Sequence, residues 1–426
     1  MKPPVAFGDR PRGKPARDGP QYGPMTPADV DLLDFDNYVA GPPHGLFALL
    51  RREDPVHWHD RPSGPAFWAI TKHADVAYVS RTPRLFSSAQ TTNVWDPPPE
   101  QLAILQGVML NMDPPKHVSY RNMVNKGFTP RRIATLEPFV RRVAREIVDA
   151  VARRGECDFV EDVAALLPTT MICELFGIPD EDRRYAYELA NRLTSADDPD
   201  MGSGDGDAHE AFAETFAYAV KLAALKRKAP AEDLATVLVQ GEIDGNPVDD
   251  LVFGTFVLMM IVAGNETTRT VTSNGMLRLM QHPEQRSALA ADPALIPNAV
   301  EEILRYDPAV HHFRRTATED TELRGARIKA GDKVVLWYPS ANRDDEVFAD
   351  PDVFDIRRPN ARDQLSFGIG QHYCLGATLA RLQLGVIFEE VLRRLPDMAL
   401  AAQPKRLRSN FINGVKEMRV RFTPSG

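Results

Sequence analysis

Residues 367–376 read Phe367-Gly368-Ile369-Gly370-Gln371-His372-Tyr373-Cys374-Leu375-Gly376, and this is the most informative segment of the sequence. Its glycines allow the backbone to turn sharply and to approach a flat ligand closely. Cys374 is expected to open a helix, where unpaired N–H groups and the helix dipole favour a thiolate, the form of cysteine that binds metals. A cysteine taken alone is more often a small buried apolar residue, so other parts of the chain must decide its role.

Two upstream segments bear on that decision. Glu302-Ile303-Leu304-Arg305 places an acid and a base three residues apart, which by itself usually makes an ordinary surface pair. Ala263-Gly264-Asn265-Glu266-Thr267-Thr268 lies in a helical pattern and begins with two residues that have almost no side chain, so a small ligand can lie against the helix. Glu266 and Thr267 supply an acid and an alcohol, the pair needed to relay protons. In an isolated helix, the Thr267 hydroxyl would instead bond back to a helix carbonyl.

The three segments occur in one order, FGxGxHxCxG following ExxR and the small-residue helix, and together they resemble the cytochrome P-450 superfamily at every specified position. The resemblance covers the chain from about residue 26 to its end. It implies a mainly α fold with minor β, in which haem b lies between the oxygen-binding helix and the cysteine loop. It also implies a monooxygenase that inserts one oxygen atom from O2 into a hydrophobic small molecule, with Cys374 as the axial thiolate ligand.

The resemblance also assigns roles to individual residues. Glu266 and Thr267 would be the catalytic pair, and Glu302 and Arg305 would be structural, locked with Arg358 behind the haem. Many bacterial relatives have histidine where this chain has Gln364, which leaves the local hydrogen bonding open but not the cofactor. The residues that would bind the cofactor, of which the two histidines and two arginines would hold its propionates, are His117, Arg121, Ala263, Gly264, Arg315, Phe367, Gly368, His372, Cys374 and Gly376.

The substrate cavity follows only from analogy with the family. Each residue taken singly is more often core than cavity lining. Together they outline an apolar cavity in which His311 and His312 are polar handles. The C-terminal half is most similar to bacterial enzymes that oxidise steroids, branched isoprenoids, alkyl chains and terpene alcohols. The substrate residues implied in this way are Val94, Trp95, Met259, Val262, Ala263, Val310, His311, Phe411 and Ile412, with Leu102 beside the first two.

Periodicity predicts a mostly helical protein with a small amount of sheet. Apolar residues recur every three or four positions over 133–151, a pattern that Gly155 ends, and again over 253–267 and 375–395. Strands are predicted at Lys333–Tyr338 and Ala66–Ile70, each after a turn signal. The segment 197–207 (DDPDMGSGDGD) is too polar and glycine-rich to pack, and is predicted to be a mobile connection, either a lid or a plain loop.

Composition narrows the class of protein. The chain has 426 residues, is 43% hydrophobic and 26% charged, and carries a net charge of −8, which argues against a nucleic-acid partner. Three cysteines are too few and too scattered for a disulfide framework and suit a reduced compartment. Residues 1–25 contain no secretory signal and are predicted to be a flexible tail before a single domain at 26–426. The longest apolar run, Leu251–Gly264, is too short to cross a bilayer. We therefore expect a soluble, cytoplasmic monomer.

The electrons for the reaction must come from outside the chain, which has no flavin or iron–sulfur motif. The resemblance implies a ferredoxin with its reductase, and Lys126, Arg131 and Arg132 either dock such an acidic partner or form a solvated face. Two other functions stay open: a peroxygenase of the same fold that uses peroxide, and a haem protein that binds ligands without oxidising them. The acid–alcohol pair at Glu266 and Thr267 argues against both.

Overall fold

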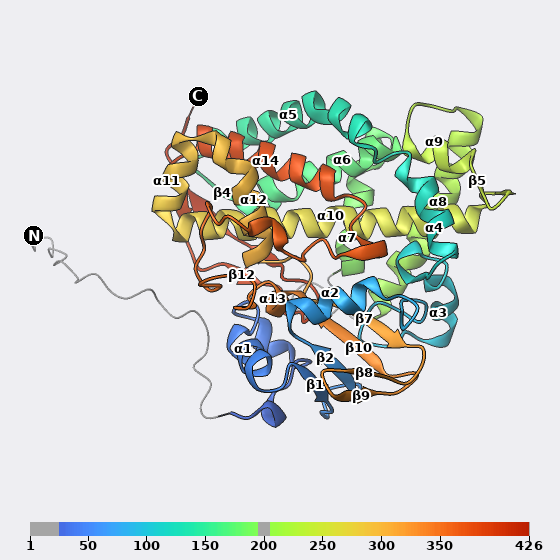
Figure 1. The fold of residues 1–426 in the computed structure, drawn as a ribbon. Helices are drawn as coiled ribbons and strands as arrows, with labels where there is room; N and C mark the ends of the chain where they lie inside the picture. The colour runs from blue at the N-terminus through green and yellow to red at the C-terminus, as the bar shows by residue number, and fades with distance from the viewer. Residues whose placement is uncertain (1–24, 195–204, 426) are drawn as a thin grey trace, which may run out of the picture.

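The computed structural model describes residues 25–194 and 205–425 of the chain. A large helical part lies above a smaller part in which strands and α1 gather, and one long helix, α10, runs through the middle of the helical part (Figure 1). The helices are α1 (His44–Glu53), α2 (His73–Arg81), α3 (Pro99–Leu105), α4 (Lys116–Asn125), α5 (Pro130–Ala152), α6 (Leu166–Phe176), α7 (Arg183–Thr194), α8 (Asp205–Lys228), α9 (Leu234–Val239), α10 (Asp250–Gln281), α11 (Pro283–Ala291), α12 (Ile296–Tyr306), α13 (Tyr338–Ala341) and α14 (Ala377–Arg394).

The strands are short, and five of them form the main sheet, in the order β1-β2-β10-β7-β3. Within it, β2 and β10 are parallel and the other neighbours are antiparallel. The described strands are β1 (Val56–His59), β2 (Phe67–Ile70), β3 (Phe86–Ser87), β4 (Glu156–Asp158), β5 (Glu242–Ile243), β6 (Asn246–Pro247), β7 (His312–Ala317), β8 (Thr321–Leu323), β9 (Ala326–Ile328), β10 (Lys333–Trp337), β11 (Ala399–Leu400), β12 (Lys405–Arg406), β13 (Val415–Glu417) and β14 (Arg419–Arg421).

The three predicted helices are α5, α10 and α14, and both predicted strands, β2 and β10, are present. One boundary differs in a way that matters for the site. The helix expected to open at Cys374 begins only at Ala377, because the N–H of Cys374 donates to the carbonyl of Phe367 at 2.8 Å and closes a loop instead. Strand β7 was not predicted, since its sequence HFRRTA contains two arginines, yet both are buried.

Two predicted flexible segments fall largely outside the described chain. The tail at 1–25 has only its last residue within it, and residues 197–204 of the polar connection are not described. The remainder of that connection corrects the prediction, because residues 205–207 begin α8. There Asp207 accepts a hydrogen bond from Nε of Arg192 at 2.7 Å, so the end of the polar segment is held by an ion pair to α7.

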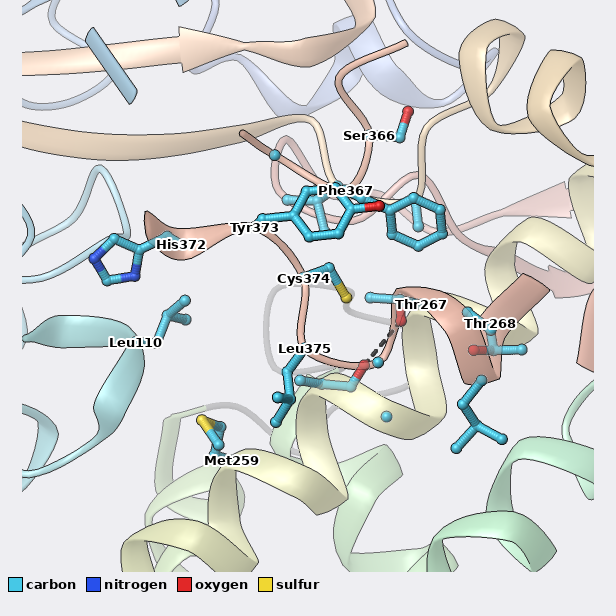
Figure 2. A pocket seen from close by; sticks show the side chains of 18 of the residues that line it. Leu110, Met259, Thr267, Thr268, Ser366, Phe367, His372, Tyr373, Cys374 and Leu375 are labelled. Atoms are coloured by element: carbon cyan, nitrogen blue, oxygen red, sulfur yellow. Dashed lines mark hydrogen bonds between the residues drawn. The ribbon is translucent and has the colours of Figure 1, made fainter. Parts of the chain in front are cut away.

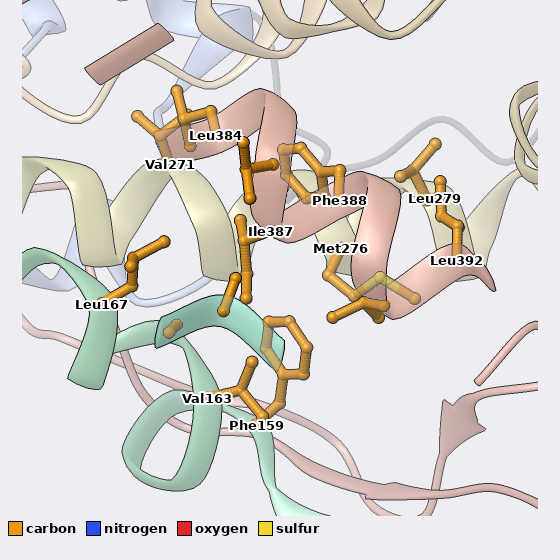
Figure 3. Packing of buried hydrophobic residues seen from close by; sticks show 14 of the residues in the cluster. Phe159, Val163, Leu167, Val271, Met276, Leu279, Leu384, Ile387, Phe388 and Leu392 are labelled. Atoms are coloured by element: carbon orange, nitrogen blue, oxygen red, sulfur yellow. The ribbon is translucent and has the colours of Figure 1, made fainter. Parts of the chain in front are cut away.

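Helix α10 owes its central place to apolar residues on several faces. Val271, Met276 and Leu279 pack against α14, and the residues that follow β4 approach from the other side (Figure 3). Each such side chain contributes about 1.5–3 kcal/mol when it is fully buried. Figure 3 labels the partners of α10 in this cluster, Phe159, Val163, Leu167, Leu384, Ile387, Phe388 and Leu392.

Length and composition alone would allow α10 to cross a membrane, and it is the one such helix within 25–194 and 205–425. The apolar run of 14 residues in the sequence is shorter than this helix. Beyond the run, α10 continues to Gln281 through residues that include threonine, serine and asparagine. Of its most apolar 18-residue stretch, with a mean hydropathy of 1.4, 61% is buried inside the protein. The packing with α6, α7, α8, α12 and α14 accounts for that burial, so α10 is a core helix.

We predict opposite effects on stability for two helical glycines. A Cβ at Gly275 of α10 would lie 2.6 Å from Phe388 and 2.9 Å from Ile303, whereas at Gly385 of α14 it would lie 4.0 Å from its nearest neighbour, Cγ2 of Ile296. Gly275→Ala should cost about 1–3 kcal/mol through overpacking, less the helix propensity that it gains. Gly385→Ala should be neutral or stabilise the protein by up to about 1 kcal/mol. Chemical denaturation of the two variants measures the difference, and equal midpoints would contradict it.

Candidate active site

A cavity lies where the loop before α14 faces the middle of α10, and it encloses about 1480 Å³ of empty space, including space open to solvent. Its lining is mostly apolar and comes from α4, α6, α10, β7, the cysteine loop and the start of α14. Figure 2 shows the Cys374 sulfur directed toward Thr267 of α10, with Leu110 and Met259 on the left of the view. The segments recognised in the sequence therefore meet at one cavity.

The cysteine loop is a turn that glycine makes possible. Gly368 and Gly370 have φ of +68° and +77°, a region that other residues rarely adopt. A side chain at Gly370 would also come within 2.9 Å of the carbonyl oxygen of Ser80 on α2. The loop therefore lies tightly against α2 and carries Cys374 at its end, with the sulfur directed into the cavity (Figure 2).

Burial raises the pKa of the Cys374 thiol above its ordinary value. The backbone N–H of Gly376 opposes this shift first, and the positive charges of Arg121 and Arg381 oppose it further. Arg381 also lies over the ring of Phe367, with 4.5 Å between its guanidinium carbon and the ring centroid. The Gly376 N–H and the two arginines therefore favour the thiolate form of Cys374. A metal cation bound to the sulfur would stabilise the thiolate further.

The other two cysteines do not share this chemistry. Cys157 and Cys173 are buried in apolar clusters, and burial raises the pKa of the first to about 12 and that of the second to about 11. Thiols of this kind are inert.

Behind the loop lies a fully buried ionic cluster. Arg305 donates from Nε and Nη2 to both carboxylate oxygens of Glu302 at 2.7 and 2.8 Å, and Arg358 adds Nε at 3.1 Å. Both arginines also donate to main-chain carbonyls of the irregular segment 342–353. These contacts join α12 to a stretch of chain with little regular secondary structure.

The same segment holds the start of the cysteine loop. The side chain of Asn342 donates to the Ser366 hydroxyl at 2.8 Å and accepts from the N–H of Leu365 at 2.7 Å. Ser366 in turn donates to the carbonyl of Leu304 on α12 at 2.6 Å. The buried ionic cluster thus supports the loop through Asn342 and Ser366.

Gln364 makes defined hydrogen bonds at the position where many relatives have histidine. Its amide nitrogen donates to Glu301 at 3.1 Å, and its amide oxygen accepts from the N–H of Ser366 at 2.6 Å. Glu301 also accepts from Nε of Arg381 at 2.5 Å. The glutamine therefore links the support of the loop to the arginine that lies over Phe367.

Four nitrogen-bearing side chains meet at one end of the cavity: His117, Arg121, Arg315 and His372. The rings of His117 and His372 lie 4.2 Å apart between centroids. Within the described chain none of the four has a carboxylate in ion-pair contact, and Arg121 and Arg315 donate only to main-chain carbonyls. Burial, and then the charge of Arg121, lower the pKa of His117 to about 4, and burial lowers the pKa of Arg315. Such a cluster is ready to receive an anion.

Thr267 faces the cavity from α10, and its hydroxyl donates to the carbonyl of Ala263 at 2.8 Å (Figure 2). This is the bond expected of a threonine in an isolated helix. Glu266 does not line the cavity: its side chain is buried against α10, where it forms an ion pair with Arg269 and accepts from the Thr270 hydroxyl at 3.2 Å. The acid and the alcohol are neighbours in sequence but have separate partners.

Gly264 lines the cavity, but a second contact explains why it is glycine. A Cβ there would lie 2.4 Å from Cδ1 of Ile172 on α6. On the same helix, the Thr169 hydroxyl donates to Asn265 at 2.9 Å. The missing side chain therefore allows α6 to pack closely on α10, in addition to any ligand that approaches from the cavity.

The predicted substrate residues divide into two groups. Met259, Ala263 and Val310 line the cavity. The other predicted residues are not among its described lining: Val94, Trp95, Val262, His311, Phe411 and Ile412, together with Leu102.

Their positions give the physical reasons. Val94 is fully buried in the cluster around Trp337, and the Trp95 ring lies against Gly64. The His311 ring packs on Tyr38, with 4.8 Å between the ring centroids, and is not part of the described cavity lining. Ile412 forms a β-bridge with Val310 and is buried beside it, outside the described lining of the cavity.

Several lining residues were missed from the sequence, among them Leu110, Ile172 and Phe313. One signal could have identified Phe313: it stands two residues before Arg315, and residues two apart on a strand share a face. No local signal distinguishes Ile172, because its place depends on how α6 packs against Gly264.

The residues present fit a haem. The cavity offers a half-buried thiol, flanking glycines and a set of cations that form no ion pair with a described acid. A Cβ at Gly376 would meet no atom within 4 Å, so a flat ring can pass close to the backbone there. Nδ1 of His117 is buried and has no hydrogen-bond partner among the described residues, as expected where a ligand would complete the bonding.

Comparison with known proteins agrees with this geometry. Residues 207–396 match the family model described as Cytochrome P450. The chain is 40% identical to a steroid C26-monooxygenase of Mycolicibacterium smegmatis over 95% of this chain and 96% of that protein. It is 38% identical to a methyl-branched lipid omega-hydroxylase of Mycobacterium tuberculosis over 98% of this chain and 99% of that protein. Among solved structures, a Mycobacterium marinum cytochrome P450 in complex with pseudoionone has a TM-score of 0.88 at 36% identity, covering 95% of this chain and 100% of that one.

A half-buried thiol that faces an apolar cavity and a threonine-bearing helix, with cations at one end that have no described carboxylate partner, defines a haem-thiolate oxygenase. The matches run over nearly the whole chain and in both sequence and fold. The chain belongs to the cytochrome P450 family. It is a monooxygenase whose cofactor is haem with an axial cysteine.

We expect Arg315→Met to weaken retention of the cofactor. Arg315 is buried at the cavity and has no carboxylate partner among the described residues, so its charge is available to the haem carboxylates. The ratio of haem to protein after gel filtration should fall several-fold. Arg314→Met is the matched control, because Arg314 is the adjacent residue and forms an ion pair with Asp96 away from the cavity. Equal haem ratios in the two variants would contradict the prediction.

Proposed function

We propose that the protein hydroxylates a steroid, a terpenoid or an alkyl-chain compound, using O2 and electrons from a ferredoxin. The apolar lining of the cavity carries this proposal: Leu110, Met259, Val310 and Phe313 offer a hydrophobic substrate a matching surface. The names of the relatives support it, since one hydroxylates steroids at C26 and another acts on methyl-branched lipids. Fold kinship alone does not choose among these substrates.

The same proposal assigns the cofactor contacts. Cys374 would supply the axial thiolate, and His117, Arg121, Arg315 and His372 would hold the propionates. Haem with such a ligand activates O2, because the thiolate donates electron density that promotes O–O cleavage. The remaining cofactor contacts would be made by residues with small side chains or flat rings, namely Ala263, Gly264, Phe367, Gly368 and Gly376.

Proton delivery is assigned to Thr267 and Glu266. Thr267 faces the cavity, where its hydroxyl can turn from the Ala263 carbonyl toward a bound ligand. Glu266 stands next to it in the chain and would resupply protons. The remaining apolar walls exclude bulk water and so protect the reaction from wasteful side reactions.

The buried cluster of Glu302, Arg305 and Arg358 is proposed to be structural. All three side chains lie outside the cavity and are satisfied by one another and by the main chain. Their role would be to keep the cysteine loop in one geometry.

We also propose that the protein is a soluble, cytoplasmic monomer. The burial of α10 and the reduced cysteines support this proposal.

Two other functions require different experiments. A peroxygenase would use peroxide and need no partner, and a haem protein that only binds ligands would oxidise nothing. Retention of both Thr267 and Glu266 favours the monooxygenase, since proton delivery to O2 has no purpose in a binding protein.

Turnover separates these possibilities. With a surrogate ferredoxin, its reductase and O2, we expect a methyl-branched fatty acid, a sterol with a branched side chain or pseudoionone to gain one oxygen atom, as measured by mass spectrometry. Product from peroxide alone would favour the peroxygenase. A ligand-induced spin-state shift without product under either condition would favour the binding protein.

We predict that the reduced protein gives the red-shifted carbonyl band of thiolate-ligated haem when exposed to carbon monoxide. Cys374→Ser should lose this band, because serine supplies no thiolate. Cys173→Ser is the control and should keep it, since Cys173 is buried away from the cavity. A carbonyl band that Cys374→Ser leaves unchanged would remove the basis for the assigned cofactor contacts.

The docking of ferredoxin is assigned to basic residues near the cavity. Lys126 and Arg131 are exposed on either side of Phe128, which lines the cavity. Arg132, also expected to take part, donates to the main-chain carbonyl of Glu232 and is partly covered. These two exposed cations therefore flank a residue of the cavity wall and make no ion pair with another described residue.

We predict that the double variant Lys126→Glu/Arg131→Glu is reduced about tenfold more slowly by an acidic ferredoxin at low salt, because charge complementarity sets the association rate. The difference should shrink as salt screens the charges. Stopped-flow reduction measures the rate, and Arg184→Glu on α7, an exposed residue outside the cavity lining, is the control. An unchanged rate with every acidic ferredoxin tested would count against this docking surface.

A further inference from the structure

A buried ion pair lies directly behind the segment proposed to deliver protons. Glu266 and Arg269 are three residues apart on α10, and both side chains are only 5% exposed. Removing charged groups from water is costly unless they are paired, so each of these side chains depends on the other. Neither residue lines the cavity, and neither belongs to the support of the cysteine loop.

Both oxygens of the Glu266 carboxylate are held by donors one turn further along α10. Arg269 Nη2 pairs with Oε2, and the hydroxyl of Thr270 donates to Oε1 at 3.2 Å. The carboxylate is further covered by the C-terminal loop, since a Cβ on Gly414 would lie 3.7 Å from Oε1. The acid is therefore held away from the cavity that Thr267 faces.

Arg269 is itself held from a second helix. Its Nη1 donates to Asn191 on α7 at 2.9 Å. Asn191 also bonds the side chain of Tyr187, whose hydroxyl donates to Glu161 at 2.7 Å. Glu161 is exposed, so a continuous row of polar side chains connects Glu266 with the surface.

The acidic neighbours of Arg269 raise its pKa. Burial lowers its pKa, but Glu266 and then Tyr187 outweigh that effect and leave the pKa above its ordinary value. Arg269 therefore stays positive, as a permanent partner for a carboxylate must.

We propose that Arg269 is a positioning residue for the monooxygenase reaction, holding the Glu266 carboxylate in place behind Thr267 and tying it to α7 through Asn191. This inference rests on the proposed role of Glu266. Arg269 touches neither substrate nor cofactor in this assignment and acts only through Glu266. Its Nε is buried and has no hydrogen-bond partner among the described residues, so this donor is also available to the carboxylate.

The test measures coupling, which is the product formed per NADH oxidised, for each haem-loaded variant with the surrogate ferredoxin system and a substrate that gives turnover. Glu266→Gln and Arg269→Met should each lower coupling at least threefold, with the lost electrons released as peroxide. Arg269→Lys should retain more than half of the coupling, because lysine keeps the charge. The carbonyl band and the substrate-induced spin shift should stay as in the wild type.

A double-mutant cycle distinguishes positioning from a general structural role. If Arg269 acts through Glu266, the double variant Glu266→Gln/Arg269→Met should lose no more coupling than the worse single variant. Arg278→Met is the matched control, since it breaks another buried ion pair of α10, with Asp307, without contacting Glu266. It should lower stability but keep the coupling of the molecules that retain haem.

The outcomes distinguish a failure of the positioning role of Arg269 from a failure of the proposed role of Glu266. Wild-type coupling in Arg269→Met together with a loss in Glu266→Gln would overturn the positioning role alone. Wild-type coupling in Glu266→Gln would overturn the role of Glu266 and this inference with it. If Arg269→Met does not retain haem, Thr270→Val replaces it, because Thr270 is the other donor to the carboxylate, and unchanged coupling there would also overturn the inference.

Discussion

The rest of the structure depends on the ion pair between Glu302 and Arg305, which solvent does not reach. Burying such a pair is costly, and the cost is offset because Arg358 also donates to the Glu302 carboxylate and main-chain carbonyls accept from the remaining donors of Arg305. What this cluster organises is a long stretch of chain that forms almost no helix or sheet. Hydrogen bonds pass from it through Asn342 and Ser366 to the cysteine loop, so the position of one sulfur atom is set by charges on a different helix.

Sequence periodicity was sufficient for the helices that form the frame. The repeats over 133–151, 253–267 and 375–395 each correspond to a helix, because an amphipathic or wholly buried helix leaves a regular pattern. It failed where tertiary contacts override local preference. Strand β7 carries two adjacent arginines, and only Asp96 and the cavity explain their burial. The start of α14 was misplaced for a similar reason, since one backbone hydrogen bond within the loop holds Cys374 outside the helix.

In the candidate site, too, the sequence predicted some features, whereas tertiary contacts decided others. Motif spacing was enough to gather the expected cofactor contacts around one cavity, because each motif lies at the end or in the middle of a rigid element. The substrate side depends on which way individual side chains point. His311 and Phe313 are two residues apart, yet only Phe313 meets the cavity, and Glu266 is buried while its neighbour Thr267 is not. Such differences are decided by packing partners that lie far away in the sequence, such as Tyr38 and Arg269.

The contrast among the three cysteines has a practical consequence for preparing the protein. Cys157 and Cys173 are shielded by apolar side chains and hold their protons tightly, whereas Cys374 stands at the wall of the cavity. A small alkylating reagent would therefore find one attackable sulfur per folded molecule, and only while iron does not cover it. Thiol titration of a folded sample becomes a direct count of molecules without cofactor, and the same chemistry makes the cofactor-free protein the form most easily damaged by oxidation.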